Sequence, residues 1–352
     1  MTHAVPLSIE SFVRRLSAVL AVLVLTAGAV AQDAPALDRT TAEAEAVAAS
    51  VDVRTAQLDL DAARREAARV EADPTSLRVA LLRARHEVEA AEDALRNARA
   101  AARDAGADAF EAALQARDGV AVASTALDIA RTEADAARIR LEAGAATEND
   151  VARADDVARS AERDLADAER RFALALDRLA QAIGRDEAPG RLVEPVADPN
   201  VPSLASVLER ATENASLRAA LRAVELAEAQ LAAVDIAFTS ARADVEAAED
   251  AVATARLRAD DLAETLRLSL RQAHDAVLAA DARRVSAEEA LATADEDVSV
   301  AVARFDAGSI SQVVLERTRL ERLRRRAELH TARIGYADAL RSLDAAVLGV
   351  AR

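Results

Sequence analysis

Residues with catalytic or metal-binding chemistry are few in this chain, and their spacing suits neither task. His86, His274 and His330 lie far apart within helical pattern, and no two of them have the spacing of a pair of metal ligands. Carboxylates are numerous, but they alternate with arginines at the i,i+4 spacing of ion pairs on a solvated helix face. The sequence has no cysteine, phosphate-binding glycine loop or nucleophile motif. We therefore expect a protein that is not an enzyme and needs no metal or cofactor.

The charge of the chain argues against another class of partner. The 352 residues carry a formal net charge of −16, and aromatic residues make up 2%. A surface this acidic repels the phosphates of nucleic acids, whose binding depends on basic patches, so we expect no nucleic-acid partner. High charge with few aromatics also occurs in disordered chains. The regular apolar spacing described below predicts helices instead.

Residues 1–31 are interpreted as a secretory signal peptide. Arg14 and Arg15 precede an apolar run over 16–30, which ends in the small residues Ala29-Val30-Ala31. The run is shorter than the roughly 20 residues that a membrane-spanning helix needs. Cleavage and export are therefore expected, and an uncleaved membrane anchor is the alternative.

The rest of the chain is predicted to contain two copies of one helical hairpin. Apolar residues at alternating spacings of three and four lead up to Gly144, and the same pattern leads up to Gly308, 164 residues later. A second apolar seam follows each glycine. The segment VEAAEDALRNAR at 88–99 recurs as VEAAEDAVATAR at 245–256, at an offset of 157. The helix that leads up to each turn glycine is called the rising arm of its repeat. The two offsets together predict that the two rising arms differ in length by about one heptad.

Prolines mark the boundary between the copies. Four of them lie between Gly184 and Ser203, which predicts a stiff, extended connector. The predicted domains are a first repeat over 32–184, a proline-rich linker over 185–202 and a second repeat over 203–352.

Within each repeat the pattern predicts very long helices. Seven-residue apolar repeats are typical of antiparallel coiled coils, so the predicted fold class is all-α. A single helix is predicted over 241–307, roughly 100 Å long at 1.5 Å per residue. In the equivalent arm of the first repeat, Gly106 and Gly119 favour a break or a kink.

Each hairpin turn has residues that suit the end of one helix and the start of the next. Gly144 and Gly308 can take the left-handed conformation that ends a helix. Thr147 is predicted to cap the next helix, with Asp150 three residues on as its capping-box partner. Ser311 has the same place in the second turn, without the acidic partner.

These turns and the seams around them resemble the TolC family of outer-membrane efflux proteins. The matching pattern starts with an aliphatic or aromatic residue, which is followed after two further residues by Gly. A Ser or Thr cap comes next, and then an apolar helix that ends near a Leu and a Gly. The resemblance is carried by LEAGAATENDV through LAQAIG (141–184) and by FDAGSISQVVL through LDAAVLG (305–349), with support from 202–234. It covers most of residues 41–349.

The resemblance implies a location, an assembly and a set of partners. Members of that family form homotrimers, in which two repeats per chain make a twelve-helix periplasmic tube attached to the outer membrane. The turns lie at the inner end of this tube, where it meets a periplasmic adaptor protein and an inner-membrane transporter. By this likeness the tube entrance would be formed by Gly144, Thr147, Glu148, Asp150, Asp306, Gly308 and Ser311. The acidic members could favour cationic cargo, and the alternative is that all seven simply cap and end helices.

The sequence also departs from the family. Family members insert two strands into each repeat to build an outer-membrane β-barrel, at positions that correspond to ADPTSL (72–77) and VDIAFTSARA (234–243) here. Neither segment has room for strands of about 9–11 residues. We therefore expect the tube helices with little or no barrel, and membrane association through no evident barrel. The predicted function is a passive export-duct subunit, and the alternative is a periplasmic coiled-coil structural or adaptor protein without transport activity.

Overall fold

The computed structural model describes residues 36–187, 189–194, 200–236 and 242–350, and nearly all of them are helical. The expected signal peptide lies outside these residues. The first repeat contains α2 (Arg39–Ala49), α3 (Val51–Ala72), α4 (Arg78–Glu142) and α5 (Glu148–Ile183). The second contains α6 (Leu204–Glu209), a short 3-10 helix (Arg210–Glu213), α7 (Ala215–Ile236), α8 (Arg242–Asp306) and α9 (Gln312–Leu348). The all-α fold class is confirmed.

The three long helices of the first repeat match those of the second in register. Helices α3, α4 and α5 begin at residues 51, 78 and 148, and α7, α8 and α9 each begin 164 residues later. Helices α4 and α8 have 65 residues each. The expected difference of one heptad between the rising arms is therefore wrong. Because a heptad pattern matches itself after seven residues, the similar segments at 88–99 and 245–256 align one heptad out of structural register.

Helix α4 runs without interruption through both of its glycines, so the expected break is wrong. Gly106 faces α2, and a Cβ atom at this position would lie 2.7 Å from the Ala46 Cβ and 2.9 Å from the Ala42 carbonyl oxygen. The missing side chain therefore allows two helices to touch. Gly119 has open space around it. Packing against α2 and α5 holds this stretch helical despite the low helix propensity of glycine.

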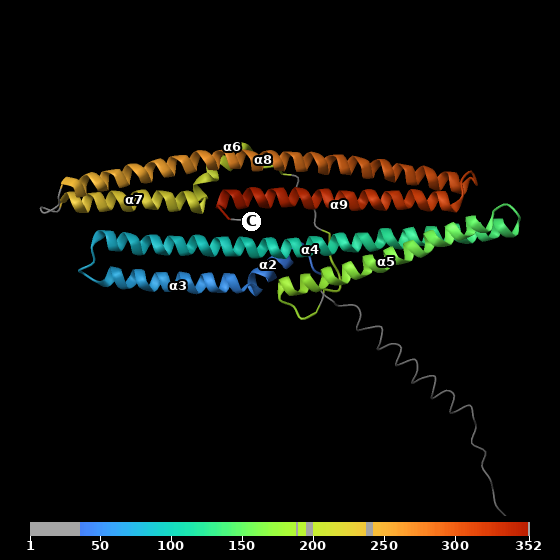
Figure 1. The fold of residues 1–352 in the computed structure, drawn as a ribbon, viewed down its shortest axis with the longest axis horizontal. Helices are drawn as coiled ribbons and strands as arrows, with labels where there is room; N and C mark the ends of the chain where they lie inside the picture. Colours follow the sequence, from blue (N-terminus) through green and yellow to red (C-terminus); the bar gives the residue numbers. More distant parts are fainter. Residues whose placement is uncertain (1–35, 188, 195–199, 237–241, 351–352) are drawn as a thin grey trace, which may run out of the picture.

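The helices form successive layers, which Figure 1 shows from one side. Helix α8 lies along one outer edge, followed by α7 and α9, then α4, and then α3 and α5. Helix α4 thus joins the repeats, since it contacts both α7 and α9 across the layer boundary.

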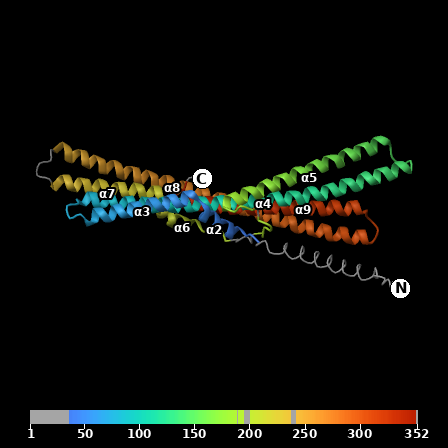
Figure 2. The ribbon, with the colours of Figure 1, turned by 90° about the horizontal axis from the view of Figure 1, so that it is seen from below.

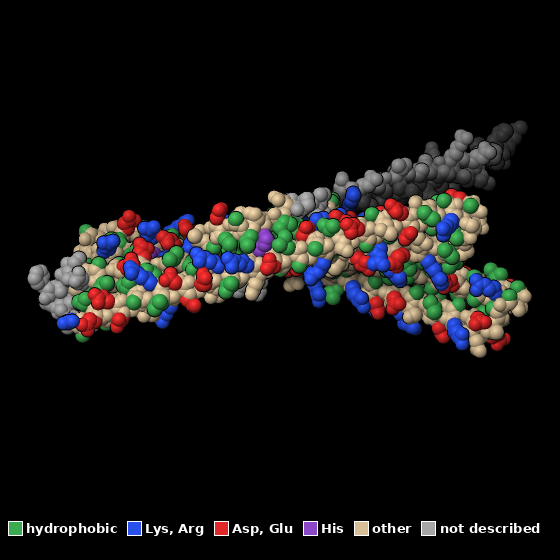
Figure 3. All heavy atoms as spheres, turned by 90° about the horizontal axis from the view of Figure 1, so that it is seen from above, with side chains coloured by type: hydrophobic (Ala, Val, Ile, Leu, Met, Phe, Trp, Pro, Cys, Tyr) green, Lys and Arg blue, Asp and Glu red, His purple; other side chains and the backbone are tan. Residues whose placement is uncertain are grey.

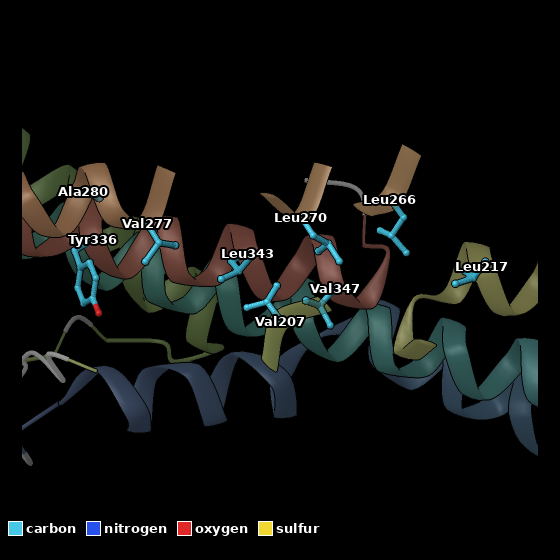
Figure 4. Packing of buried hydrophobic residues seen from close by; sticks show 9 residues of the cluster. All are labelled: Val207, Leu217, Leu266, Leu270, Val277, Ala280, Tyr336, Leu343 and Val347. Carbon is cyan, nitrogen blue, oxygen red and sulfur yellow. The ribbon is translucent and has the colours of Figure 1, made fainter. Parts of the chain in front are cut away.

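The largest apolar cluster lies in the second repeat, where α6, α7, α8 and α9 meet (Figure 4). Leu270, Val277 and Val347 are fully buried there, and Tyr336 packs beside them. Burial of one such leucine or valine contributes about 1.5–3 kcal/mol. A smaller cluster around Phe110 holds α2, α4 and α5 together in the first repeat.

Alanines fill the narrow seams of the hairpins toward their turns. Ala130, Ala134 and Ala137 of α4 are buried against α5. Small side chains let the two helices approach closely, but they bury less apolar area per layer than leucine would. The hairpin arms therefore depend on length for their stability.

The two hairpins cross near the middle of the molecule, so the ends that carry the α4–α5 and α8–α9 turns diverge (Figure 2). Near the crossing the start of the first repeat pairs with the linker: the Leu37 amide donates to the Arg191 carbonyl and the Val193 amide to the Leu37 carbonyl, both at 2.9 Å.

Of the two places where family members insert strands, the structure describes only one in full, the segment around 72–77. Residues 73–77 form a tight turn between α3 and α4, in which the Thr75 amide donates to Asp73 Oδ1 at 2.9 Å. Residues 237–241 lie outside the described part of the chain. Across the described ranges, no helix combines the length and the apolar character needed to span a membrane.

Candidate functional site: the hairpin turns and the contacts between repeats

The first hairpin turn has the capping geometry that its sequence predicts. Gly144 has φ +71°, and the Gly144 amide donates to the Leu141 carbonyl at 2.9 Å. The Asp150 amide donates to Thr147 Oγ1 at 3.3 Å, and the Thr147 amide donates back to Asp150 Oδ2 at 2.9 Å. These bonds complete a capping box at the start of α5. The hydrogen bond from the Thr147 backbone, and then that from its hydroxyl, lowers the pKa of Asp150.

The second turn repeats the glycine geometry without the side-chain cap. Gly308 has φ +67°, and its amide donates to the Phe305 carbonyl at 2.8 Å. Ser311 occupies the N-cap position of α9, but its side chain makes no capping hydrogen bond. Ser309 is bound more firmly, since its hydroxyl donates to the Arg304 carbonyl at 2.8 Å. The helix start at α9 is therefore the less secured of the two.

All seven residues predicted for the entrance are exposed, and they form two groups. Gly144, Thr147, Glu148 and Asp150 lie on one turn, and Asp306, Gly308 and Ser311 lie on the other. Both turns are at the same end of the molecule (Figure 1), on hairpins that diverge there (Figure 2). A Cβ atom at either turn glycine would meet nothing within 4 Å. A single copy thus presents two open, partly acidic tips.

Between the tips and the crossing point, an ion pair links the two hairpins. Arg317 of α9 donates to Glu133 Oε1 of α4 at 2.5 Å. Both side chains are partly exposed, so the pair contributes at most about 1 kcal/mol. Its position makes it a restraint on how far the hairpins separate.

At the crossing point His330 of α9 lies between two carboxylates. Its Nδ1 contacts Asp118 of α4, and its Nε2 lies 3.2 Å from Glu194 of the linker. Arg117 and Arg326 each donate to Glu194 Oε1 at 2.8 Å. Burial opposes the charge on Asp118 and Glu194, but His330 and the neighbouring arginines outweigh it, and the pKa of each carboxyl is lowered. This cluster fastens α4, the linker and α9 to one another.

A second cluster centres on Arg341 of α9. The guanidinium donates to both oxygens of Glu111 on α4 at 2.9 Å, and also to Asp108 Oδ1 at 2.8 Å. Glu111 is only 3% exposed. Burial opposes the charge on Arg341, but the hydrogen bond and charge of Glu111 outweigh it, and its pKa is raised. Removing Arg341 would leave the buried Glu111 carboxylate with Arg39 alone, whose Nη1 lies 3.5 Å from Glu111 Oε1.

A third cluster joins α4 to α7 near the other end of the molecule. Asp93 of α4 is 4% exposed and accepts hydrogen bonds from Arg96, Arg218 and Arg222. The Arg222 Nη1 to Asp93 Oδ2 distance is 3.1 Å. His86 of α4 also contacts Glu225 of α7, at 3.0 Å. The contact between the repeats is therefore strongly ionic along its length.

Sequence reasoning found the Thr147 cap, but the cap expected at Ser311 makes no side-chain hydrogen bond, and these contacts between repeats were missed. A signal was present, because some of the charged residues of this contact change their charge at the 164-residue offset. Arg341 corresponds to Asp177, and Asp93 corresponds to Leu257. Positions where two copies differ in charge mark places where their surroundings differ. Within the described ranges, no group of three or more His, Cys, Asp or Glu residues is arranged to hold a metal ion.

No family model and no curated protein matches the sequence. Solved structures match the fold. The CmeC outer membrane channel of Campylobacter jejuni aligns with a TM-score of 0.63 at 12% identity, covering 88% of this chain and 85% of the channel. A membrane protein from Pseudomonas aeruginosa gives 0.62 at 16% identity, with 88% and 92% covered. The outer-membrane channel OprN gives 0.60 at 16% identity, with 89% and 90% covered.

At this identity the likeness concerns the fold. The alignments cover 88–89% of this chain, which includes most of its long helical hairpins. This chain therefore has the helical fold of the TolC-like outer-membrane channels.

Proposed function

We propose that this chain is a subunit of a TolC-like efflux duct, a passive and non-enzymatic conduit for export. The observation that carries the proposal is the shared helical fold, which extends over 88% of the chain in the match to CmeC. Helices α4 and α8 have 65 residues each, or about 98 Å at 1.5 Å per residue. Helices of this length suit a wall that crosses a wide aqueous compartment. The expected signal peptide fits an exported protein of the periplasm and outer membrane.

The duct is proposed to assemble as a homotrimer with its hairpin turns at the entrance. Three copies would bring three of each turn together, where a periplasmic adaptor protein and an inner-membrane transporter would dock. The exposed carboxylates of Glu148 and Asp306 would then face the entering cargo. Asp150 is less available, because its carboxylate accepts the hydrogen bonds of the Thr147 cap. This entrance would favour cationic cargo and respond to salt.

Two measurements test the assembly. We expect the purified protein to have the mass of a trimer and to form hollow tubes in electron micrographs. A stable monomer or an extended dimer would contradict the duct and favour the structural or adaptor role.

The role of the turns is tested in cells that depend on this protein for resistance to toxic compounds. Replacing Gly144 and Gly308 with valine strains both turns, since a β-branched residue disfavours positive φ. We expect sensitivity to rise at normal protein levels. The matched control is Gly119→Val, at an exposed helical glycine with open space around it. Unchanged sensitivity in the double turn variant would contradict a role at the entrance.

A further inference from the structure

A cleft lies beside the crossing of the hairpins, where α4, α5, the linker and α9 meet. Its volume is about 580 Å³, and sites for small molecules usually have about 300–1,000 Å³. The linker wall of the cleft is fixed by two other parts of the chain. The Leu37 backbone exchanges hydrogen bonds with Arg191 and Val193 at 2.9 Å. Arg117 Nη1 of α4 donates to the Leu192 carbonyl at 3.3 Å. The cleft is therefore formed by the fold of a single copy.

Part of the lining of the cleft is apolar. Phe172 and Leu176 of α5 contribute to it, together with Leu192 of the linker. Phe172 is only partly buried, whereas its equivalent in the second repeat, Tyr336, is 2% exposed. The first repeat therefore leaves part of an aromatic ring uncovered at a place where the second repeat covers it. An apolar group that filled the cleft would remove this surface from water, which favours binding.

The charged side chains that line the cleft are mainly arginines. Arg117, Arg191 and Arg326 stand against one carboxylate, that of Glu194, so the charges of the lining side chains sum to +2. The whole chain has a formal net charge of −16. On the face of the molecule that Figure 3 shows, arginines and carboxylates are interspersed along the length. The excess of positive charge in the cleft departs from that pattern and attracts anions.

Two of these arginines are already paired, and the third is available. Arg117 and Arg326 each donate to Glu194 Oε1 at 2.8 Å, and Arg117 also lies 3.3 Å from Asp118 Oδ1. Within the described ranges the exposed side chain of Arg191 makes no hydrogen bond or ion pair. A guanidinium presents its N–H donors in a planar fork that suits the paired oxygens of an acidic group. The cleft therefore places an available cation next to an uncovered aromatic ring.

We propose that this cleft binds a small organic anion, whose acidic group pairs with Arg191 and whose apolar body covers Phe172 and Leu176. The acidic group is a carboxylate, sulfonate or phosphate, carried either by a free acid or by a lipid. The inference goes beyond the proposed duct and does not depend on it, because one copy supplies every wall of the cleft. Since the walls belong to both repeats and to the linker, a bound anion also stabilises their arrangement.

The test uses two fluorescent probes that differ in one group. Anilinonaphthalene sulfonate carries an acidic group on an apolar ring system, and phenylnaphthylamine has the same rings without that group. Both fluoresce weakly in water and strongly in apolar surroundings, so titration of the purified full chain gives their affinities. Arg191→Gln should weaken binding of the sulfonate probe by about fivefold or more, because a charge-assisted hydrogen bond is lost. Binding of the uncharged probe should stay unchanged.

Arg178→Gln provides the matched control. Arg178 is an exposed arginine of α5 that does not line the cleft, and its side chain also lacks a hydrogen bond or ion pair in the described part of the chain. This variant should bind both probes like the wild type. Phe172→Ala should weaken both probes, since both place their rings on the apolar wall. Circular dichroism checks that each variant keeps its helix content.

Equal binding of the sulfonate probe by the wild type and Arg191→Gln would overturn the site, and so would an equal loss in Arg178→Gln. Sedimentation with phosphatidylglycerol vesicles distinguishes the two sources of the acidic group. Binding to these vesicles that Arg191→Gln abolishes would assign the group to a lipid, and a chain that binds the probe but no vesicles would assign it to a free acid. A monomeric chain that binds the sulfonate probe through Arg191 would contradict the duct and support the cleft.

Discussion

Thr147 and Ser311 stand at equivalent N-cap positions, 164 residues apart, but they differ in what they bind. Thr147 completes a capping box with Asp150, whereas the Ser311 side chain makes no capping hydrogen bond. A capping hydrogen bond satisfies a backbone amide that the helix leaves unpaired at its first turn. The two tips therefore differ in how the first turn of the helix after the glycine is capped.

Thr147→Ala should destabilise the start of α5 by about 1 kcal/mol, the usual contribution of an N-cap hydroxyl. The expected result is faster hydrogen exchange of the amides in the first turn of α5. Ser311→Ala is the control and should change exchange in α9 by much less, because no capping bond is lost. Equal effects at both turns would show that the capping box has no energetic advantage.

At the scale of helices, the two glycines of α4 have opposite structural roles. Gly106 lets α2 touch α4, and Gly119 lies in open space. At Gly106 the space between two helices limits which side chain fits. At Gly119 only the helix propensity of the residue matters.

Gly106→Val should destabilise the protein by about 1–3 kcal/mol, since the added carbons overlap Ala46 and the backbone of Ala42. Gly119→Ala should stabilise it by somewhat less than about 1 kcal/mol, because alanine is the better helix former. Urea unfolding at constant protein concentration measures both. A neutral Gly106→Val variant would mean that α2 is not held closely against α4.

How much of this structure the sequence predicts depends on the range of the interaction concerned. The cap at Thr147 and the end of α4 near Gly144 are set by neighbours within a few residues, and both were predicted correctly. The length of the rising arms was not, because a heptad seam fits itself equally well one heptad away. The pairing of Arg341 with Glu111 could not be found either, since it joins two helices far apart in the chain, where many carboxylates could be the partner. Whether the seven turn residues form an entrance stays a prediction.

At the scale of the whole molecule, the crossing of the two hairpins is held by His330, Asp118 and Glu194, with Arg117 and Arg326 beside them. The pKa values of Asp118 and Glu194 are lowered in the folded protein. Carboxylates of this kind stabilise the folded state above their ordinary pKa values, and this stabilisation is lost as the pH falls through the lowered values. Acid should therefore loosen the hairpins at their crossing.

The free energy of unfolding should start to fall near the ordinary carboxyl values of 3.8 and 4.5 and continue to fall below them. His330→Gln should have a shallower decline over this range, because its carboxylates have pKa values closer to the ordinary ones. Urea unfolding between about pH 3 and 6 gives both curves. His274→Gln is the control, since His274 contacts the Pro202 carbonyl oxygen and no carboxylate is bound to it in the described residues. Parallel curves for wild type and His330→Gln would contradict the role of this cluster.

The equal lengths of α4 and α8 set the same distance between the far loop and the glycine turn in both repeats. Each arm spans the same number of turns between the far loop and the glycine turn, and in a single copy the α4–α5 tip extends beyond the α8–α9 tip (Figure 1). A deletion of seven residues from one arm and its partner would leave every seam contact in phase, yet it would shift that tip by about 10 Å relative to the other. The same deletion in both repeats would shift the two tips alike and keep the offset between them.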